Sequence, residues 1–194
     1  MKHLVAVFSL LLASGLSNHL AAQSSAQQKF ASGGTIRLHL ESGGYTINPT
    51  DSDQIVVTCS ARPESKLRDV KVKIDAGAST ADVYVKDTPN GNFNATIEVP
   101  RRSNLWARLT AGELVVEDIE GDKNIEARAG RLSITIHPEQ YGHRDAALLT
   151  GSIEAGVFGV NKGGLFRSFE QNGSGKYRFH AHLMSGEIYL HDTH

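Results

Sequence analysis

Apolar and polar residues alternate along most of this sequence, and the alternation changes phase at a glycine. The pattern is clearest in residues 105–136, where it occurs twice, around Gly112 and Gly130. In both copies apolar or small residues stand one, three and five positions before the glycine and two and four positions after it. Each copy therefore predicts two short strands joined by a corner, because side chains alternate between the two faces of a strand. Glycine suits such a corner because it adopts positive φ without a β-carbon clash.

The same offsets recur elsewhere in the chain. They surround Gly43, Gly151 and Gly186, and looser versions mark corners at Gly77 and Ser60. Successive corners are separated by 17, 17, 35, 18, 21 and 35 residues, and each gap of 35 is interpreted as two rungs with one degenerate corner. A regular advance of about 17–21 residues predicts an all-β protein, a parallel β-helix-like solenoid of short coils that stack on one another.

Stacking also predicts which side chains are neighbours. If Gly112 and Gly130 lie on adjacent rungs, Arg108 lies beside Glu126, and Glu113 lies beside Arg131. Both pairs are of opposite charge and point outward. Exposed pairs of this kind add only about 0.2–1 kcal/mol each, but they help to fix the register of the rungs.

Residues 1–22 have the layout of a secretory signal peptide. Lys2 precedes an apolar run from Leu4 to Leu16, and small residues lead up to a cleavage point expected after Ala22. The run is shorter than the roughly 20 apolar residues that cross a bilayer, so a membrane anchor is the weaker interpretation. The protein is therefore expected to be exported, either to the periplasm or out of the cell, without a transmembrane anchor after cleavage.

The remaining sequence divides into a leader and one domain. Residues 23–32 are polar and lack periodicity, which predicts a flexible leader, and a single β-solenoid domain is expected over residues 33–194. Without residues 1–22 the chain has 19 basic and 21 acidic side chains, a formal charge of −2, so nothing in it attracts nucleic acid. The only cysteine, Cys59, excludes an internal disulfide and is expected to pack as a small apolar side chain, a reactive thiol being the alternative.

Residues 97–136 resemble the adhesin-like β-solenoid family of bacterial cell-envelope proteins, whose function is unknown. The resemblance lies in a strand that ends in proline, followed by repeated units with glycine at the corner, and it extends from Gly33 to Leu190. Ala111 and Ala129 stand where the family usually has serine. The resemblance implies a right-handed β-helix-like fold, export, and an adhesive or interaction role. It supplies no catalytic residues.

Metal and catalytic sites are not indicated by the sequence. His180 and His182 point outward on one expected strand, but no third ligand accompanies them, so no metal site and no cofactor are predicted. The enzymatic alternative is a carbohydrate-active enzyme on the same scaffold, which would require Glu154, Asp118 or Asp122 to converge in a groove. Charges on the expected outward ladders are mixed and dispersed, so no catalytic residues are assigned and a non-enzymatic protein is expected.

Aromatic residues interleaved with cations are the candidate partner-binding residues. Residues 156–178 interrupt the repeat, and Trp106 is expected to point outward beside arginines. The candidates are Trp106, Phe158, Phe166, Arg167, Phe169 and Tyr177. Such residues bind sugars or proteins, but the alternative that they fill and cap the core is favoured for residues 156–178. The partner is unknown; an envelope protein or a glycan is the expected class, and an envelope-stress accessory role is the remaining alternative.

Overall fold

The computed structural model describes residues 25–192 and is all-β, as predicted. The signal-peptide prediction for residues 1–22 lies outside the described residues. The strands are β1 Ser25–Lys29, β2 Thr35–Leu40, β3 Gly43–Thr50, β4 Gln54–Ala61, β5 Lys71–Ala76, β6 Thr80–Lys86, β7 Phe93–Pro100, β8 Asn104–Val116, β9 Lys123–Thr135, β10 Tyr141–Ala155, β11 Val160–Asn172 and β12 Tyr177–His191. Three short 3₁₀ turns connect them: η1 Glu64–Asp69, η2 Pro138–Gln140 and η3 Gly156–Phe158.

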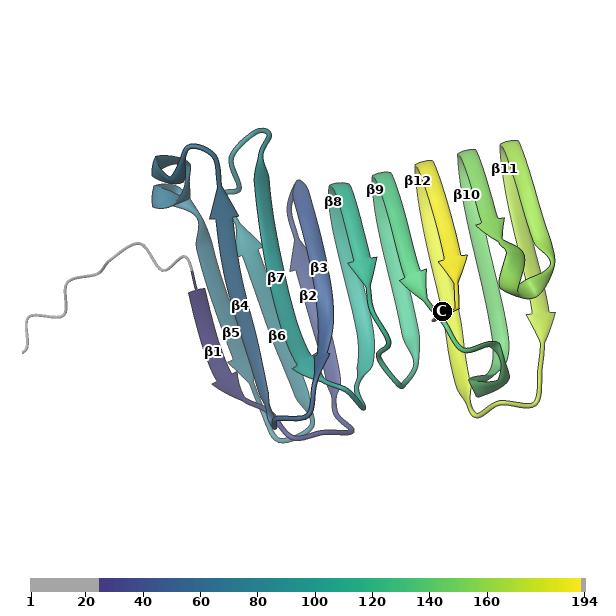
Figure 1. Cartoon of the computed structure of the whole chain (residues 1–194), viewed down its shortest axis with the longest axis horizontal. Coiled ribbons are helices and arrows are strands. Elements are labelled where there is room, and N and C mark those ends of the chain that lie inside the picture. Colours follow the sequence, from purple (N-terminus) through teal and green to yellow (C-terminus); the bar gives the residue numbers. More distant parts are fainter. Residues whose placement is uncertain (1–24, 193–194) are drawn as a thin grey trace, which may run out of the picture.

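Four long strands bend at a glycine and stack in parallel (Figure 1). The glycines are Gly112 in β8, Gly130 in β9, Gly186 in β12 and Gly151 in β10, with φ of +123°, +124°, +133° and +132°. They lie side by side in register, glycine opposite glycine. The fifth corner, Gly43, begins β3 and lies opposite Gly112, while β2 pairs with the first half of β8, so β2 and β3 form an equivalent bent rung as two strands.

The order of the stack differs from the order of the sequence. The neighbours run β8, β9, β12, β10 and β11, so the last strand of the chain lies between β9 and β10 (Figure 1). The sheet is also mixed rather than wholly parallel. Antiparallel pairing occurs at both ends of the stack, where β11 pairs with β10, and where β5 pairs with β6 and β4 pairs with β7 and β1.

Two expected corners are not bends of parallel rungs. Gly77 lies in the turn between the antiparallel strands β5 and β6, where its N–H donates to the carbonyl of Thr80 (2.8 Å). Ser60 lies within β4, opposite Asn94 of the antiparallel strand β7. Both positions follow alternating apolar residues, which a hairpin strand produces as well as a rung does. The long gaps in the corner spacing correspond to strands such as β7 and β11, which carry no glycine bend in parallel register.

Regular structure is present before Gly33, where the domain was expected to start. Residues 25–29 form β1 on the outside of β4, and Phe30 is buried in the core (3% exposed). The expected flexible leader is therefore a strand over this range. Polar side chains obscured it in the sequence, because four of its five residues are solvent-exposed and the strand shows no apolar alternation.

One continuous hydrophobic core fills the space between the two halves of the bent strands. It contains the inward residues that the repeat offsets identify, for example Leu109, Leu114, Ile125 and Leu132, all at most 3% exposed. Cys59 also packs there, and burial raises the pKa of its thiol to about 11, which disfavours the reactive thiolate at neutral pH.

The pairing of β8 with β9 confirms the predicted neighbours, Arg108 beside Glu126 and Glu113 beside Arg131. Arg108 forms an ion pair with Glu126 (Nε to Oε2, 3.1 Å). Glu113 lies opposite Arg131 in register, but Arg131 forms its ion pair with Glu187 of β12.

Within residues 25–192, no helix has the length and apolar composition needed to cross a membrane.

Candidate binding surface

Outward side chains on the first halves of the bent strands form one broad surface, here called the outer face. Register places residues from distant parts of the sequence in a row across it: His39 of β2 lies opposite Arg108 of β8, which lies opposite Glu126 of β9, which lies opposite His182 of β12. A second row lies two residues further along each strand, closer to the corner glycines, and consists of Glu41, Thr110, Arg128 and Met184. The outer face therefore combines side chains from four strands, which only the stacking brings together.

Trp106 belongs to an aromatic and cationic cluster on this face. The His39 ring stacks on Tyr84 of β6, with centroids 4.5 Å apart, and meets Trp106 edge to face at 5.3 Å. The guanidinium of Arg108 lies over the Trp106 ring, 4.5 Å from its centroid. A hydrogen bond from His39 Nε2 to Asp82 (3.1 Å) holds the imidazole in place. Trp106 is thus outward, as expected, and half-buried by its neighbours on the same face rather than by residues 62–69, whose 3₁₀ turn η1 packs against β4.

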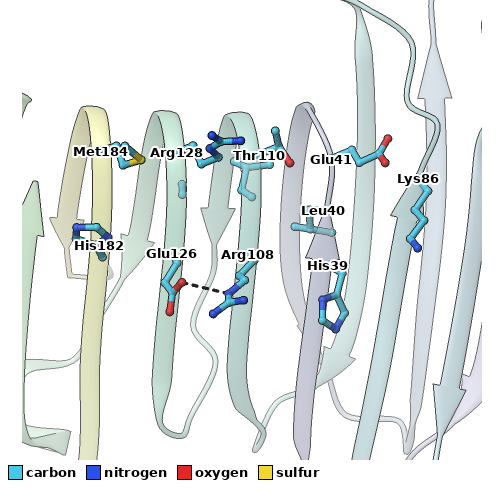
Figure 2. Close-up of a pocket in the computed structure, with 12 residues that line it drawn as sticks. His39, Leu40, Glu41, Lys86, Arg108, Thr110, Glu126, Arg128, His182 and Met184 are labelled. Atoms are coloured by element: carbon cyan, nitrogen blue, oxygen red, sulfur yellow. Dashed lines mark hydrogen bonds and ion pairs between the residues drawn. The ribbon is translucent and has the colours of Figure 1, made fainter. Parts of the chain in front are cut away.

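Between the two rows lies a groove of about 390 Å³, here called the outer groove (Figure 2). One side carries His39, Arg108, Glu126 and His182, and the other carries Glu41, Thr110, Arg128 and Met184. Lys86 of β6 closes one end, and the buried residues Leu40, Leu109 and Ala127 lie between the rows. The groove runs across the strands, so a ligand in it would touch side chains of successive rungs.

The acids of the outer groove are already engaged, whereas two of its cations are not. Glu126 is paired with Arg108, and Glu41 accepts the backbone N–H of Thr88 (3.3 Å). Lys86 lies over the Tyr84 ring at 5.1 Å, and in the described part of the chain neither Lys86 nor Arg128 has an acidic partner. The groove therefore offers positive charge to a ligand.

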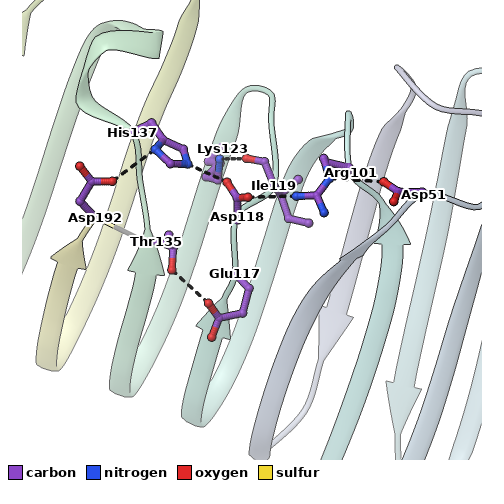
Figure 3. Close-up of polar contacts among 9 residues, drawn as sticks. All are labelled: Asp51, Arg101, Glu117, Asp118, Ile119, Lys123, Thr135, His137 and Asp192. Atoms are coloured by element: carbon purple, nitrogen blue, oxygen red, sulfur yellow. Dashed lines mark hydrogen bonds and ion pairs between the residues drawn. The ribbon is translucent and has the colours of Figure 1, made fainter. Parts of the chain in front are cut away.

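Glu154 lies apart from the other two acids of the enzymatic alternative. Asp118 is held by Arg101 (2.9 Å) and by His137 (2.7 Å) in the loop after β8 (Figure 3). Asp122 accepts the backbone N–H of Arg178. Glu154 lies near the end of β10, and β10 is three strands from β8, or roughly 14 Å at about 4.8 Å per strand.

His143 and His180 both contact Asp145 of β10. His180 contacts one oxygen of Asp145 (2.6 Å), and His143 contacts the other (3.4 Å). Across residues 25–192 no group of three or more His, Cys, Asp or Glu side chains has a geometry that would hold a metal ion. His182 is exposed on the outer groove, separate from this pair.

A buried polar group, Lys123 with Tyr141, lies beside the loop between β8 and β9, and neither residue lines the outer groove. Lys123 at the start of β9 is 2% exposed and donates to the carbonyl of Ile119 (Figure 3). It also donates to the hydroxyl of Tyr141. Tyr141 in turn donates to the carbonyl of Gly121 (3.3 Å). Burial lowers the pKa of Lys123 to about 8, partly offset by the charge of Asp118, and burial raises that of Tyr141. This group satisfies the carbonyls of the loop between β8 and β9, which is a structural role.

The aromatics of residues 156–178 separate into buried and exposed members. Phe169 is buried (6% exposed) and packs near the half-buried Phe158, whose ring lies under the Arg144 guanidinium at 4.4 Å. Tyr177 is half-buried beside Tyr141 at the start of β12. Phe166 is 77% exposed. Phe158, Phe169 and Tyr177 thus pack in or against the core, and Phe166 is the most exposed of the four.

Arg167 is solvent-exposed on the outermost strand, and its register places it on the core side of the sheet. It lies opposite the buried Leu148, and its Nε donates to the carbonyl of Gly163 (2.7 Å). Lys162 lies opposite the buried Ile153 and donates to the carbonyl of Ser168 (2.7 Å). Two cations therefore occupy core-facing positions of β11.

Sequence reasoning found Trp106 but missed the outer groove, whose lining residues His39 and Arg108 contact Trp106. Apart from Lys86, the outward groove residues stand two or four positions before the corner glycines of different rungs, so each looks like an ordinary outward position of its own strand. The available signal was the ladder of outward residues that precede the glycines, His39, Arg108, Glu126 and His182, once these rungs are placed beside one another.

Comparisons with known proteins give the fold. No family model matches the sequence, and no curated protein matches it. A crystal structure described as a "putative cell adhesion protein" from Clostridium sporogenes superposes with a TM-score of 0.55 at 12% identity, covering 87% of this chain and 99% of that one. A "putative adhesin" from Bacteroides fragilis covers 86% and 96% at 10% identity, with a TM-score of 0.29. The first likeness shows a shared fold.

Proposed function

We propose that this protein is an exported, non-enzymatic binding protein of the adhesin type, and that the outer groove contacts its partner. The observation that carries the proposal is the groove itself, in which cationic, hydroxyl, imidazole and apolar side chains from successive strands line one continuous depression. A rigid sheet suits such a role because its side chains are held in place by the strands, and little ordering is needed on binding. The cell-adhesion description of the structural neighbour agrees with this role.

The proposal includes the architecture of the stack. The bent strands β8, β9, β12 and β10 are a short parallel β-solenoid, right-handed as the family resemblance implies, and the antiparallel strands close its two ends. Like positions of neighbouring rungs then form straight ladders, which explains why the outer groove crosses the strands.

Binding to cell envelopes tests the function. The protein without residues 1–22 is labelled and its binding to purified bacterial envelopes is measured by sedimentation. Thr110→Trp, which fills the groove from an exposed position, should reduce binding at least tenfold. Thr58→Trp, at an exposed threonine of β4 outside the groove, should not. Equal binding by both variants would contradict the proposed site, and release of reducing sugar from a polysaccharide panel would contradict the non-enzymatic role.

Export is tested independently. Expression of the full chain in a Gram-negative host, followed by fractionation and N-terminal sequencing, should give a periplasmic or extracellular protein that begins at Gln23. An intact N-terminus in the cytoplasm would contradict export while leaving the binding role open to the envelope assay.

A further inference from the structure

We propose that the outer groove binds an acidic polysaccharide, with sugar carboxylates held by Arg128 at one position and by Lys86 at another. This inference rests on the proposed function and deepens it by naming the ligand class. It starts from the charge of the groove: its two acids are satisfied within the protein, by Arg108 and by the Thr88 N–H, whereas Lys86 and Arg128 have no acidic partner among residues 25–192.

The placement of the two cations indicates a chain-like ligand. Lys86 lies on β6 and Arg128 on β9, so β2 and β8 lie between them. Three strand spacings of about 4.8 Å put them roughly 14 Å apart. A single small anion cannot reach both, whereas a chain of several sugar rings laid along the groove can present a carboxylate to each.

The groove favours a saccharide over a peptide. β2, β8 and β9 are hydrogen-bonded on both sides in this part of the sheet, so no strand edge is open to pair with the main chain of a peptide. Recognition must come from side chains. Thr110 and His182 can exchange hydrogen bonds with sugar hydroxyls, and the thioether of Met184 offers an apolar contact to a ring face.

A nucleic acid is disfavoured by the rest of the protein. The formal net charge is −1, and the groove contains Glu41 and Glu126 besides its cations. A closely spaced phosphate chain would meet these carboxylates and a net negative molecule, whereas a uronic acid polymer carries fewer charges per unit length and many hydroxyls.

Binding of defined oligosaccharides tests the inference. Oligogalacturonate of about six rings is titrated into the protein without residues 1–22 by calorimetry, with a neutral gluco-oligosaccharide of equal length and dextran sulfate as comparison ligands. Lys86→Gln and Arg128→Gln should each weaken oligogalacturonate binding about tenfold, the loss of one charge-assisted hydrogen bond. Arg178→Gln is the matched control, because Arg178 is also exposed on β12 but lies outside the groove. It should leave affinity unchanged.

Binding of the acidic but not the neutral oligosaccharide, lost in the two groove variants and partly retained in Arg128→Lys, supports the inference. Equal binding of the neutral oligosaccharide, or no binding of oligogalacturonate, overturns the inference. It is also overturned if dextran sulfate binds more tightly and Arg178→Gln weakens that binding as much as Lys86→Gln and Arg128→Gln do. If Thr110→Trp still abolishes envelope binding in that case, the proposed function stands and only the ligand class fails.

Discussion

Arg131 on β9 forms an ion pair with Glu187 on β12 (Nη2 to Oε2, 2.6 Å), although β10 and β11 lie between the two strands in the sequence. The same arginine lies opposite Glu113 on its other side. β9 is therefore flanked by β8 and by the last strand of the chain. The C-terminal strand joins the earlier rungs to β10 and β11, which have no other connection to the stack through strand pairing among the described residues.

Removing β12 should therefore unfold much more than one strand. Deletion of residues 177–194 removes four large, fully buried side chains, Phe179, Leu183, Ile188 and Leu190. At about 1.5–3 kcal/mol each, their loss approaches the whole stability of a typical domain. We expect the deletion to abolish cooperative thermal unfolding, followed by circular dichroism. Deletion of residues 1–29 is the control, since β1 buries none of its side chains, and it should leave a cooperative transition. A cooperative transition in the C-terminal deletion would contradict the central placement of β12.

The sequence predicted individual rungs well but could not predict their order. Leu109, Ala127 and Leu183 occupy equivalent inward positions on β8, β9 and β12, and any of these rungs could pack on any other. Chain order is the natural guess when the copies are interchangeable. It fails here because the chain turns back through β11, an antiparallel strand that carries cations where the repeat has apolar residues, and β12 then enters the stack beside β9.

The corner residues show why some glycines were assigned correctly and Gly77 was not. In the four bent strands the glycine is followed by a polar or charged residue and then by Leu or Ile, which turns back into the core. Gly77 is followed by Ala and Ser, so no inward residue follows the turn. This second half of the pattern, rather than alternation before the glycine, distinguishes a rung from a hairpin.

Gly130→Ala should destabilise the protein strongly. The residue has φ of +124°, and a β-carbon there would overlap the carbonyl of Gly112 on the next strand. We expect a loss of about 3 kcal/mol or more in urea denaturation, because positive φ and a backbone clash both oppose the side chain. Gly77→Ala is the control: it has no positive φ and its β-carbon would meet only ordinary contacts, so a change within about 0.5 kcal/mol is expected. Similar losses in both variants would contradict the different roles of the two glycines.

Stability should rise in alkaline solution because of Lys123. Its folded pKa of about 8 lies below the ordinary lysine value of 10.5, so between these values the unfolded chain holds a proton that the folded protein has released. The free energy of unfolding therefore increases with pH in this window, by about 2 kcal/mol between pH 8 and pH 10 from this group. Lys123→Met should lack this contribution. Other groups also titrate, so the measured quantity is the difference between the two proteins in urea denaturation at pH 8 and pH 10; a constant difference would contradict the burial of a titrating amine.

One end of the stack is the edge strand β11, not the last strand of the chain. The core-facing cations of β11 should keep further copies of the protein from adding at this end. Lys162 and Arg167 donate to carbonyls of β11 itself, and inward charges on an edge strand disfavour strand addition. The nearby Leu165 and Phe166 are 61% and 77% exposed and would favour it. Replacing both cations, Lys162→Val with Arg167→Leu, should therefore produce concentration-dependent association in size-exclusion chromatography with light scattering. Adding Phe166→Ser should reduce the association by removing apolar contact area. If the double variant is monomeric at all concentrations, the cations do not prevent strand addition at this edge.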